Sequence, residues 1–359
     1  MIQPSSKRFI GSGILCFIVT VAFVVYSDDV YDVLTPVHYK DHIGATLLTS
    51  ENYSLVDSEP GELLPANITQ TLVSSLGYDD RTSIYQSRRD KIYQACEKYE
   101  NRFKKHRHKL PLHNLYISQK HKFIYCAIPK VGCTNWFKTL LVLSGQFKQD
   151  DVIGWREINL YRRAHYGGLR EYNKLVGSGR VGEFIRFVVV RHPFTRLVSL
   201  FAQKLDRRPD RRLISELLSK MQQITESNSS TMNFHNFVDY LIKTKEPTET
   251  WNSHFRPMHL LCFPCNIDYD IIGHLETIHE DSEYLFHEIG STLSYPKKSS
   301  RTATNSSTTD NLLRYFSTIS DDQIWNLYKI YKMDFEMFGY SPSEFFPFPN
   351  KNRTQNIII

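Results

Sequence analysis

The sequence predicts an α/β fold, in which a central parallel sheet is flanked by helices and preceded by one N-terminal transmembrane helix. Three observations predict it: an uncharged apolar run near the N-terminus, a repeated succession of apolar run, turn and amphipathic helix, and an ordinary globular composition. Repeated strand-to-helix units favour a parallel sheet, because each helix returns the chain to the end of the sheet where the previous strand began, so the next strand runs in the same direction. The 359 residues are enough for one large or two ordinary domains.

Residues 9–26 carry no charge, and as a helix they would be roughly 27 Å long. That length spans the hydrocarbon core of a thin bilayer. Lys7 and Arg8 precede the run and two aspartates follow it, which predicts a signal anchor with residues 1–8 in the cytoplasm. A cleaved signal peptide is the alternative, although no small-x-small cleavage site follows the run. Both interpretations place the rest of the chain in the secretory lumen or outside the cell.

The region after the anchor is divided by charge. Residues 27–87 are acidic and show no sustained periodicity, which predicts a luminal stem. A basic globular body is expected over 88–345 and a C-terminal tail over 346–359. A basic body attracts polyanions, and a luminal location excludes nucleic acid as its natural partner. Five N-glycosylation sequons agree with the lumen: Asn52, Asn67, Asn228, Asn305 and Asn352.

Apolar periodicity and breakers predict the elements of the body. Thr134 is expected to cap a helix that stops at Gly145, and Pro193 precedes another helix. Residues 291–310 are expected to form a loop. In chain order we expect a helix over 90–109, a strand over 122–128, a helix over 134–145, a strand over 185–190, a helix over 194–205, a strand over 267–275 and a helix opened by Ser320.

The segment 129–136, Pro-Lys-Val-Gly-Cys-Thr-Asn-Trp, joins a predicted strand to a predicted helix. Such a turn presents free backbone N–H groups and the positive end of the helix dipole. Gly132 permits close approach, Lys130 supplies charge and Thr134 supplies a hydroxyl, which suits a phosphate or sulfate. The spacing is not that of a Walker loop, because the lysine precedes the only glycine. An ordinary capped helix is the alternative.

A second turn of this kind is Arg-His-Pro-Phe-Thr-Arg-Leu-Val-Ser over 191–199. Arg191 follows a predicted strand, at the edge where open α/β sheets bind ligands. Ser199 lies on the same helical face as Thr195. A guanidinium and a hydroxyl in this position would hold a second phosphate. The alternative is that Arg196 and Ser199 lie on a solvated helix face.

Together the two turns resemble the nucleotide-binding motifs of the Golgi carbohydrate sulfotransferases, especially the branch that sulfates chondroitin, dermatan and glucuronate-bearing glycans. The resemblance implies a P-loop-like sulfotransferase fold. The sequence departs from the family pattern at His192, Phe255 and Phe137, where members usually carry an acidic residue, a tryptophan and a basic residue. The resemblance covers roughly 120–340 and continues in the segments 254–257, 261–270, 273–277 and 331–340.

The resemblance also implies a reaction. Sulfate would pass from 3′-phosphoadenosine 5′-phosphosulfate, by in-line displacement and without a metal, to a hydroxyl of an acidic glycosaminoglycan such as position 4 of N-acetylgalactosamine in chondroitin. Lys130 would stabilise charge on the leaving oxygen, while Arg191 and Ser199 would bind the 3′-phosphate. The 5′ side would be held by the first turn, namely Pro129, Lys130, Val131, Gly132, Cys133, Thr134 and Asn135.

The acceptor hydroxyl must lose a proton, and a neutral histidine is a suitable base near neutral pH. His254 lies in one of the segments that carry the resemblance. His165 lies between the two turns, where related uronyl sulfotransferases carry a catalytic histidine. The alternative for each is a structural or substrate-contacting role.

Cys262 and Cys265 form a C-x-x-C pair. In an oxidising lumen we expect them to take part in disulfides, whose partners the sequence does not reveal. Zinc would need two further ligands, for which His254 and His259 are nearest. A redox-active pair or two free thiols would also fit this spacing.

The sequence thus predicts a single-pass type II membrane protein of the Golgi, with a luminal sulfotransferase body. Alternatives are a sulfotransferase for terminal glucuronate or N-linked N-acetylgalactosamine, and a catalytically silent glycan-binding membrane protein. A luminal kinase would need the Walker spacing that the chain lacks. The basic runs 102–109 and 207–212 suit an acidic glycan or a solvated surface. The sequence does not specify an oligomeric state.

Overall fold

The computed structural model describes residues 66–104, 114–164, 168–225, 231–296 and 308–343. No helix within these ranges is long and apolar enough to cross a bilayer. The predicted anchor 9–26 and tail 346–359 lie outside the described residues, and so does His165. The same holds for four of the five sequons: Asn52, Asn228, Asn305 and Asn352.

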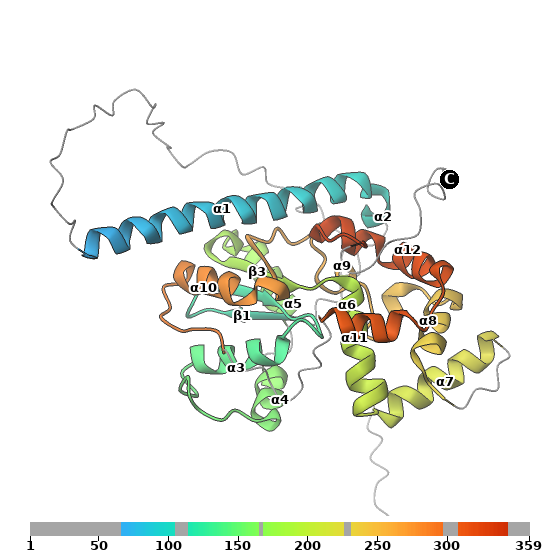
Figure 1. Cartoon of the computed structure of the whole chain (residues 1–359). Helices are drawn as coiled ribbons and strands as arrows, with labels where there is room; N and C mark the ends of the chain where they lie inside the picture. Colours follow the sequence, from blue (N-terminus) through green and yellow to red (C-terminus); the bar gives the residue numbers. More distant parts are fainter. Residues whose placement is uncertain (1–65, 105–113, 165–167, 226–230, 297–307, 344–359) are drawn as a thin grey trace, which may run out of the picture. The chain divides into compact units, whose positions relative to one another are not determined.

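A four-stranded sheet forms the centre of the described body (Figure 1). Its order is β1 (Leu115–Ser118), β2 (Phe123–Cys126), β3 (Ile185–Val190) and β4 (Ile271–His274). The three predicted strands are confirmed, and they pair in parallel. The expectation of a wholly parallel sheet is wrong, because the unpredicted β1 pairs antiparallel with β2. Only a short turn separates these two strands, and such a connection allows antiparallel pairing alone.

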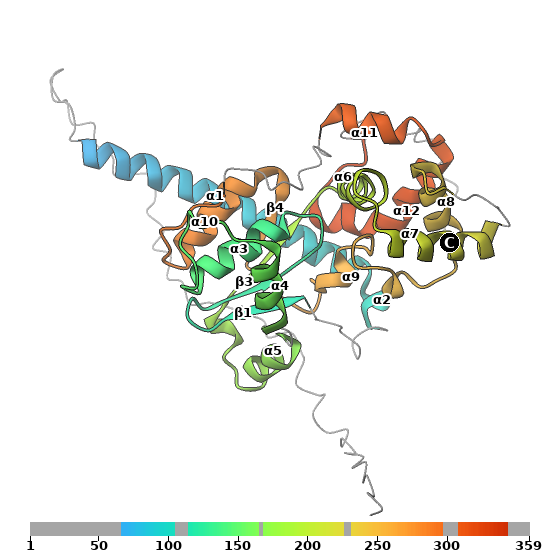
Figure 2. The same ribbon diagram turned by 90° about the horizontal axis from the view of Figure 1, so that it is seen from below.

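Helices cover both faces of the sheet. α3 (Cys133–Leu143) and α4 (Trp155–Ala164) lie on one side, and α1 (Ala66–Lys98) lies on the other (Figures 1 and 2). Trp136 of α3 is fully buried, and its ring centroid lies 4.8 Å from that of Phe187 on β3. This aromatic packing fixes α3, and therefore the turn before it, against the sheet.

A second apolar cluster lies beyond the strands and consists of helices. It is built around Phe194, Phe201, Phe237 and Phe335. Its elements are α6 (Pro193–Leu200), the π-helix η3 (Phe201–Arg207), α7 (Arg211–Thr225), α8 (Phe234–Lys243), α11 (Thr309–Phe316) and α12 (Asp321–Phe338). Ser320 opens α12, as predicted, and the structure adds a capping box with Gln323.

The remaining elements are short connections or flank the sheet. They are α2 (Glu100–Lys104), α5 (Gly168–Gly177), η2 (Val181–Glu183), η4 (Thr248–Thr250), α9 (His259–Cys262), η5 (Leu275–Thr277) and α10 (Ile278–Glu288).

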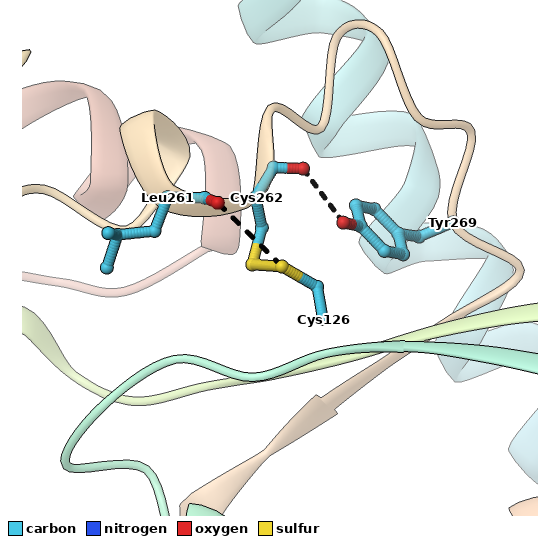
Figure 3. Close-up of a disulfide and its surroundings, with 4 residues drawn as sticks. All are labelled: Cys126, Leu261, Cys262 and Tyr269. Carbon is cyan, nitrogen blue, oxygen red and sulfur yellow. Dashed lines mark hydrogen bonds between the residues drawn. A yellow bond between two sulfur atoms is a disulfide. The ribbon is translucent and has the colours of Figure 1, made fainter. Parts of the chain in front are cut away.

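Two disulfides join segments that are distant in the sequence. Cys96 of α1 pairs with Cys265, and Cys126 at the end of β2 pairs with Cys262 of α9. Figure 3 shows the second disulfide beside Tyr269, whose hydroxyl donates to the Cys262 carbonyl at 2.8 Å. Cys262 and Cys265 are therefore bonded to other cysteines and not to each other. Neither offers the thiolate that a zinc site would need.

The boundary that we expected at Arg88 lies inside α1. This helix begins at Ala66, and Tyr85 is only 1% exposed. The first part of α1 carries only a short apolar stripe, Ile68, Leu72 and Leu76, within an acidic and polar segment, which is why the segment resembled a stem. The packed body therefore extends upstream of residue 88.

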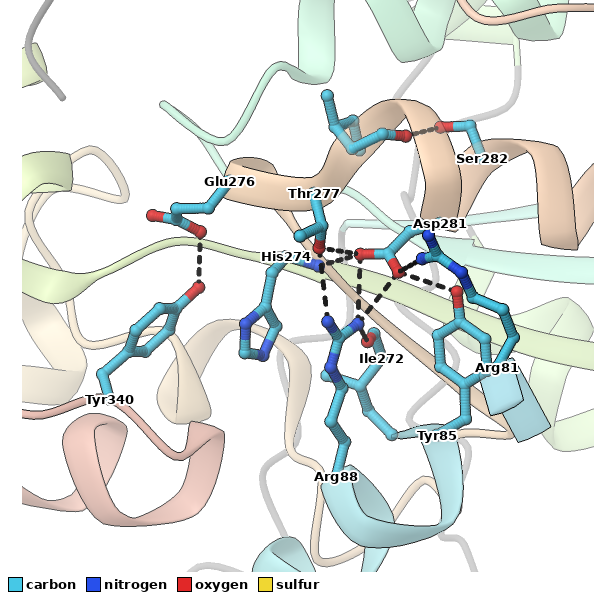
Figure 4. A network of polar contacts seen from close by, with 11 residues as sticks. Arg81, Tyr85, Arg88, Ile272, His274, Glu276, Thr277, Asp281, Ser282 and Tyr340 are labelled. Carbon is cyan, nitrogen blue, oxygen red and sulfur yellow. Dashed lines mark hydrogen bonds and ion pairs between the residues drawn. The ribbon is translucent and has the colours of Figure 1, made fainter. Parts of the chain in front are cut away.

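A polar network fixes α1 to the rest of the body (Figure 4). The carboxylate of Asp281 is fully buried, and Arg88 donates to it at 3.0 and 3.1 Å. Tyr85 and Thr277 donate to it as well, at 2.7 and 2.8 Å, and so does the backbone N–H of His274 at 2.7 Å. One carboxylate thus joins α1, α10 and the end of β4.

Replacing Asp281 should destabilise the body. Asp281→Ala leaves the Arg88 guanidinium without its buried partner, and we expect a loss of about 3–5 kcal/mol in unfolding free energy, measured by chemical denaturation. Glu183→Ala removes an exposed partner of Arg180 and should leave that energy almost unchanged. Equal effects of the two substitutions would contradict this account.

The disulfide pairing can be checked directly. Mass spectrometry of non-reduced proteolytic peptides should recover the pairs Cys96–Cys265 and Cys126–Cys262, with Cys133 as a free thiol. A peptide containing a Cys262–Cys265 bond would contradict the structure.

Candidate functional site

The first predicted anion-binding turn lies between β2 and α3. Gly132 is the N-cap of α3 with φ of 82°, and no side chain caps the helix. The prediction that Thr134 is the cap is therefore wrong, because the helix begins one residue before it. The predicted stop at Gly145 is confirmed, since the helix ends two residues earlier and Gly145 has φ of 80°. The N–H groups of Cys133 and Thr134 precede the first intrahelical hydrogen bonds of α3, which Asn135 and Trp136 donate to the Gly132 carbonyl at 3.0 and 3.3 Å.

Gly132 occupies a position where a side chain would be crowded and the backbone conformation strained. A Cβ there would lie 3.0 Å from Oη of Tyr295, and the positive φ would strain any L side chain. Gly132 thus allows Tyr295 and Leu275 to pack closely against the turn.

Lys130 occupies the same turn in a strained conformation. Its φ is 75°, a value that costs a non-glycine residue about 1–2 kcal/mol. The ammonium group donates to the side-chain oxygen of Gln203 on η3. Burial, and next the charge of Arg191, lower the pKa of Lys130 to about 7. Its charge therefore depends on what binds beside it.

Arg191 connects the second turn to the first. It lies just after β3 and is buried, and its Nη1 donates to the Lys130 carbonyl at 3.1 Å. Its Nε donates to Oγ1 of Thr195 at 2.9 Å. Ser199 is also buried on α6. Burial lowers the pKa of Arg191 to about 10, so the group stays cationic at neutral pH. The two turns that the sequence suggested separately are thus in direct contact.

Arg196 shows that α6 has no solvated face here. The side chain is buried, and its Nε donates to the Pro129 carbonyl at 3.0 Å. Its Nη1 donates to the Arg256 carbonyl at 2.8 Å and its Nη2 to the Ser253 carbonyl at 2.9 Å. The alternative of a surface arginine is therefore wrong. The signal in the sequence was an arginine among the apolar residues of α6.

His254 directly follows Ser253, and Lys130 directly follows Pro129. The Arg196 guanidinium donates to the carbonyls of both Ser253 and Pro129, so it fixes the backbone beside His254 and beside Lys130. Burial, and next the charges of Lys204, Lys130, Arg196 and Arg162, lower the pKa of His254 to about 4. The imidazole is therefore neutral at neutral pH.

The positions that depart from the family pattern are largely buried. Phe137 packs on Tyr116 and lies under the Arg162 guanidinium, and Phe255 packs on Phe237. Both contribute to the apolar cores, so neither offers a polar group to a ligand.

His192 is also buried, and it links the second turn to the chain after α12. Its Nε2 lies 3.0 Å from the Ser341 carbonyl, and its backbone N–H donates to Glu276 at 3.1 Å. The Tyr340 hydroxyl donates to the other oxygen of Glu276 at 2.8 Å (Figure 4). Burial lowers the pKa of His192 to about 4.

These groups fit an anionic nucleotide. A buried guanidinium, a lysine with a lowered pKa and the open start of α3 are gathered around two adjoining turns, and such cations and N–H groups bind phosphate and sulfate. Within the described ranges, no group of His, Cys, Asp and Glu has the arrangement of a metal site.

Known proteins are similar to this chain in sequence. The model of the sulfotransferase family matches residues 113–341. Carbohydrate sulfotransferase 11 of Rattus norvegicus is 33% identical over 273 residues, which cover 72% of this chain and 76% of that protein. Carbohydrate sulfotransferase 10 of Rattus norvegicus is 29% identical over 288 residues, 76% of this chain and 80% of that protein. Carbohydrate sulfotransferase 12 of Mus musculus is 32% identical over 264 residues, 65% of this chain and 61% of that protein.

No solved structure matches the chain significantly. The family model nevertheless spans more than half of the sequence and includes both turns. The chain therefore belongs to the sulfotransferase family, among its carbohydrate sulfotransferases.

Proposed function

We propose that this protein transfers sulfate from 3′-phosphoadenosine 5′-phosphosulfate to a hydroxyl of a glycosaminoglycan, and that the acceptor is position 4 of N-acetylgalactosamine in chondroitin. The observation that carries the proposal is the contact between Arg191 and the Lys130 carbonyl, at 3.1 Å. It brings together the turn expected to bind the 5′-phosphosulfate and the turn expected to bind the 3′-phosphate.

In the reaction, the acceptor oxygen forms the new bond to sulfur as the bond from sulfur to the bridging phosphate oxygen breaks. Nε2 of His254 receives the proton of the hydroxyl, and the ammonium group of Lys130 stabilises the charge on the bridging oxygen. Arg191 and Ser199 hold the 3′-phosphate, and the first turn from Pro129 to Asn135 holds the 5′ side. Positioning and charge provide the acceleration, as in phosphoryl transfer.

Charge complementarity supports an acidic acceptor. Arg162 and Lys204 both act electrostatically on His254, so cations surround the proposed base. The basic run 207–212 spans the end of η3 and the start of α7. Carboxylates of a chondroitin chain would find partners there. Terminal glucuronate or N-linked N-acetylgalactosamine is the alternative acceptor.

The compartment is proposed from the covalent structure. Two disulfides within the described residues are characteristic of an oxidising compartment. With the apolar run 9–26 as an anchor, they support a single-pass Golgi membrane protein whose body is luminal and glycosylated.

The direct test incubates the secreted chain with labelled donor and a panel of desulfated glycans, followed by disaccharide analysis. Label on the 4-position of N-acetylgalactosamine supports the proposal. Label on another sugar corrects the acceptor. Donor binding without transfer to any glycan favours the catalytically silent alternative.

Loss of Lys130 should affect transfer strongly. We expect Lys130→Ala to lower kcat by about 10²-fold or more, because one donor to the developing charge is removed. Lys174→Ala, at an exposed lysine of α5, is the matched control and should transfer at the wild-type rate. Equal rates for the Lys130 variant and the wild type would refute the assignment.

The pH profile follows from two lowered pKa values. His254 must be neutral, so kcat/KM should rise as pH increases through about 4. Lys130 must be charged, so kcat/KM should fall as pH increases through about 7. In Lys130→Arg the falling limb should move to higher pH, because arginine stays protonated. An unchanged limb would show that another group titrates.

The base is tested by His254→Gln and His165→Gln. We expect a loss of about 10²–10⁴-fold in kcat for His254→Gln with donor affinity retained, and a smaller effect for His165→Gln. If both variants transfer sulfate at wild-type rates, neither residue is the base.

A further inference from the structure

His254 lies in a tight turn that begins at Asn252. The backbone carbonyl of Asn252 accepts hydrogen bonds from the N–H groups of Phe255 and Arg256, at 3.0 and 2.9 Å. Its side-chain Oδ1 accepts from the N–H of His254 at 3.0 Å, which makes the segment an Asx turn. The same Oδ1 lies 2.8 Å from Nδ1 of the His254 ring.

These two contacts define the state of the ring. A backbone N–H can only donate, so the Asn252 atom facing it is the amide oxygen and not the nitrogen. An amide oxygen can only accept, so Nδ1 of His254 carries the hydrogen. In a neutral imidazole, Nε2 then holds the lone pair. Among the described residues, no hydrogen bond to this nitrogen is found.

We propose that Asn252 is a positioning residue that holds His254 as its Nδ1–H tautomer, so that the lone pair of Nε2 receives the proton of the acceptor hydroxyl. The proposal rests on the proposed function for its last step, and on geometry alone for the tautomer.

The surroundings explain why the partner is an amide. The charged groups that act on the ring are all cations: Lys130 before α3, Arg162 on α4, Arg196 on α6 and Lys204 on η3. Burial first, and next these cations, keep the imidazole neutral, so its tautomer decides whether Nε2 can act as a base. A carboxylate at position 252 would hold the same tautomer but would favour the charged ring.

The turn itself is held by other contacts. Arg256 donates twice to the Trp251 carbonyl, at 3.0 and 2.7 Å, and the Tyr331 hydroxyl donates to the Phe255 carbonyl at 2.6 Å. Arg196 holds the Ser253 carbonyl. Loss of the Asn252 side chain should therefore release the ring more than the backbone.

The tautomer is measured without any acceptor. In the full chain labelled with ¹⁵N-histidine, long-range ¹H–¹⁵N spectra distinguish a protonated ring nitrogen from one with a lone pair, and His254→Gln assigns the signal. We expect Nδ1–H in the wild type and in Asn252→Asp, and a mixture or the other tautomer in Asn252→Ala. An Nε2–H ring in the wild type, or an unchanged tautomer in Asn252→Ala, would overturn the proposal.

Kinetics on desulfated chondroitin then test the consequence. We expect Asn252→Ala to lower kcat about tenfold or more with KM for the donor unchanged. Asn252→Asp should retain most of kcat and move the rising limb of the kcat/KM profile to higher pH by about 1–3 pH units.

The control is Asn233→Ala. The Asn233 side chain also accepts from a backbone N–H, that of Asn236 at 2.8 Å, but it caps α8 and should change thermal stability only. A loss of kcat in the control equal to that in Asn252→Ala would reduce Asn252 to a structural role. A wild type that sulfates no glycan would refute the proposed function while the spectra still decide the tautomer.

Discussion

The site depends on the buried guanidinium of Arg196. It donates to the carbonyls of Pro129, Ser253 and Arg256, and the first of these lies more than a hundred residues from the other two in the sequence. Arginine suits this role because its donors have a fixed, planar geometry. The disulfide between Cys126 and Cys262 joins the same two regions covalently. A hydrogen-bonded link and a covalent link thus fix the phosphosulfate-binding turn against the segment that carries the proposed base.

Burial and neighbouring charges determine the protonation states of the side chains in this site. Lys130, Arg191 and Arg196 lie close together away from bulk water, and burial lowers the pKa of each. A bound polyanion would reverse the effect on Lys130, because an opposite charge favours the ammonium form. His254 is kept neutral by burial and the same field. A charged lysine and a neutral histidine therefore coexist over a range of mildly acidic to neutral pH.

The sequence predicted the parts whose signal is local. Short apolar runs indicated the three parallel strands, the proline or glycine after two of these runs indicated both turns, and Ser320 indicated the start of α12. The start of α1 was missed because the apolar stripe before Tyr85 is short and is not sustained, although that tyrosine is buried. β1 was missed because its apolar run, residues 115–117, is only three residues long and lies between polar residues.

The contacts between residues that are distant in the sequence could not be predicted from the sequence alone. Arg196 resembled a surface residue because arginines usually are, and only the fold reveals the carbonyls that surround it. The partner of Cys265 lies 169 residues away, and no local pattern specifies such a pairing. Asn252 was not singled out, since its contact with His254 depends on the shape of one turn.

If the two turns hold the two ends of one nucleotide, a ligand with two phosphates should bind more tightly than a ligand with one. Calorimetric titration of the protein with adenosine 3′,5′-bisphosphate and with adenosine 5′-monophosphate measures this difference. We expect the wild type to bind the bisphosphate at least about tenfold more tightly, a difference of about 1.4 kcal/mol, and Arg191→Gln to lose this preference. Equal affinities of the wild type for the two nucleotides would contradict it.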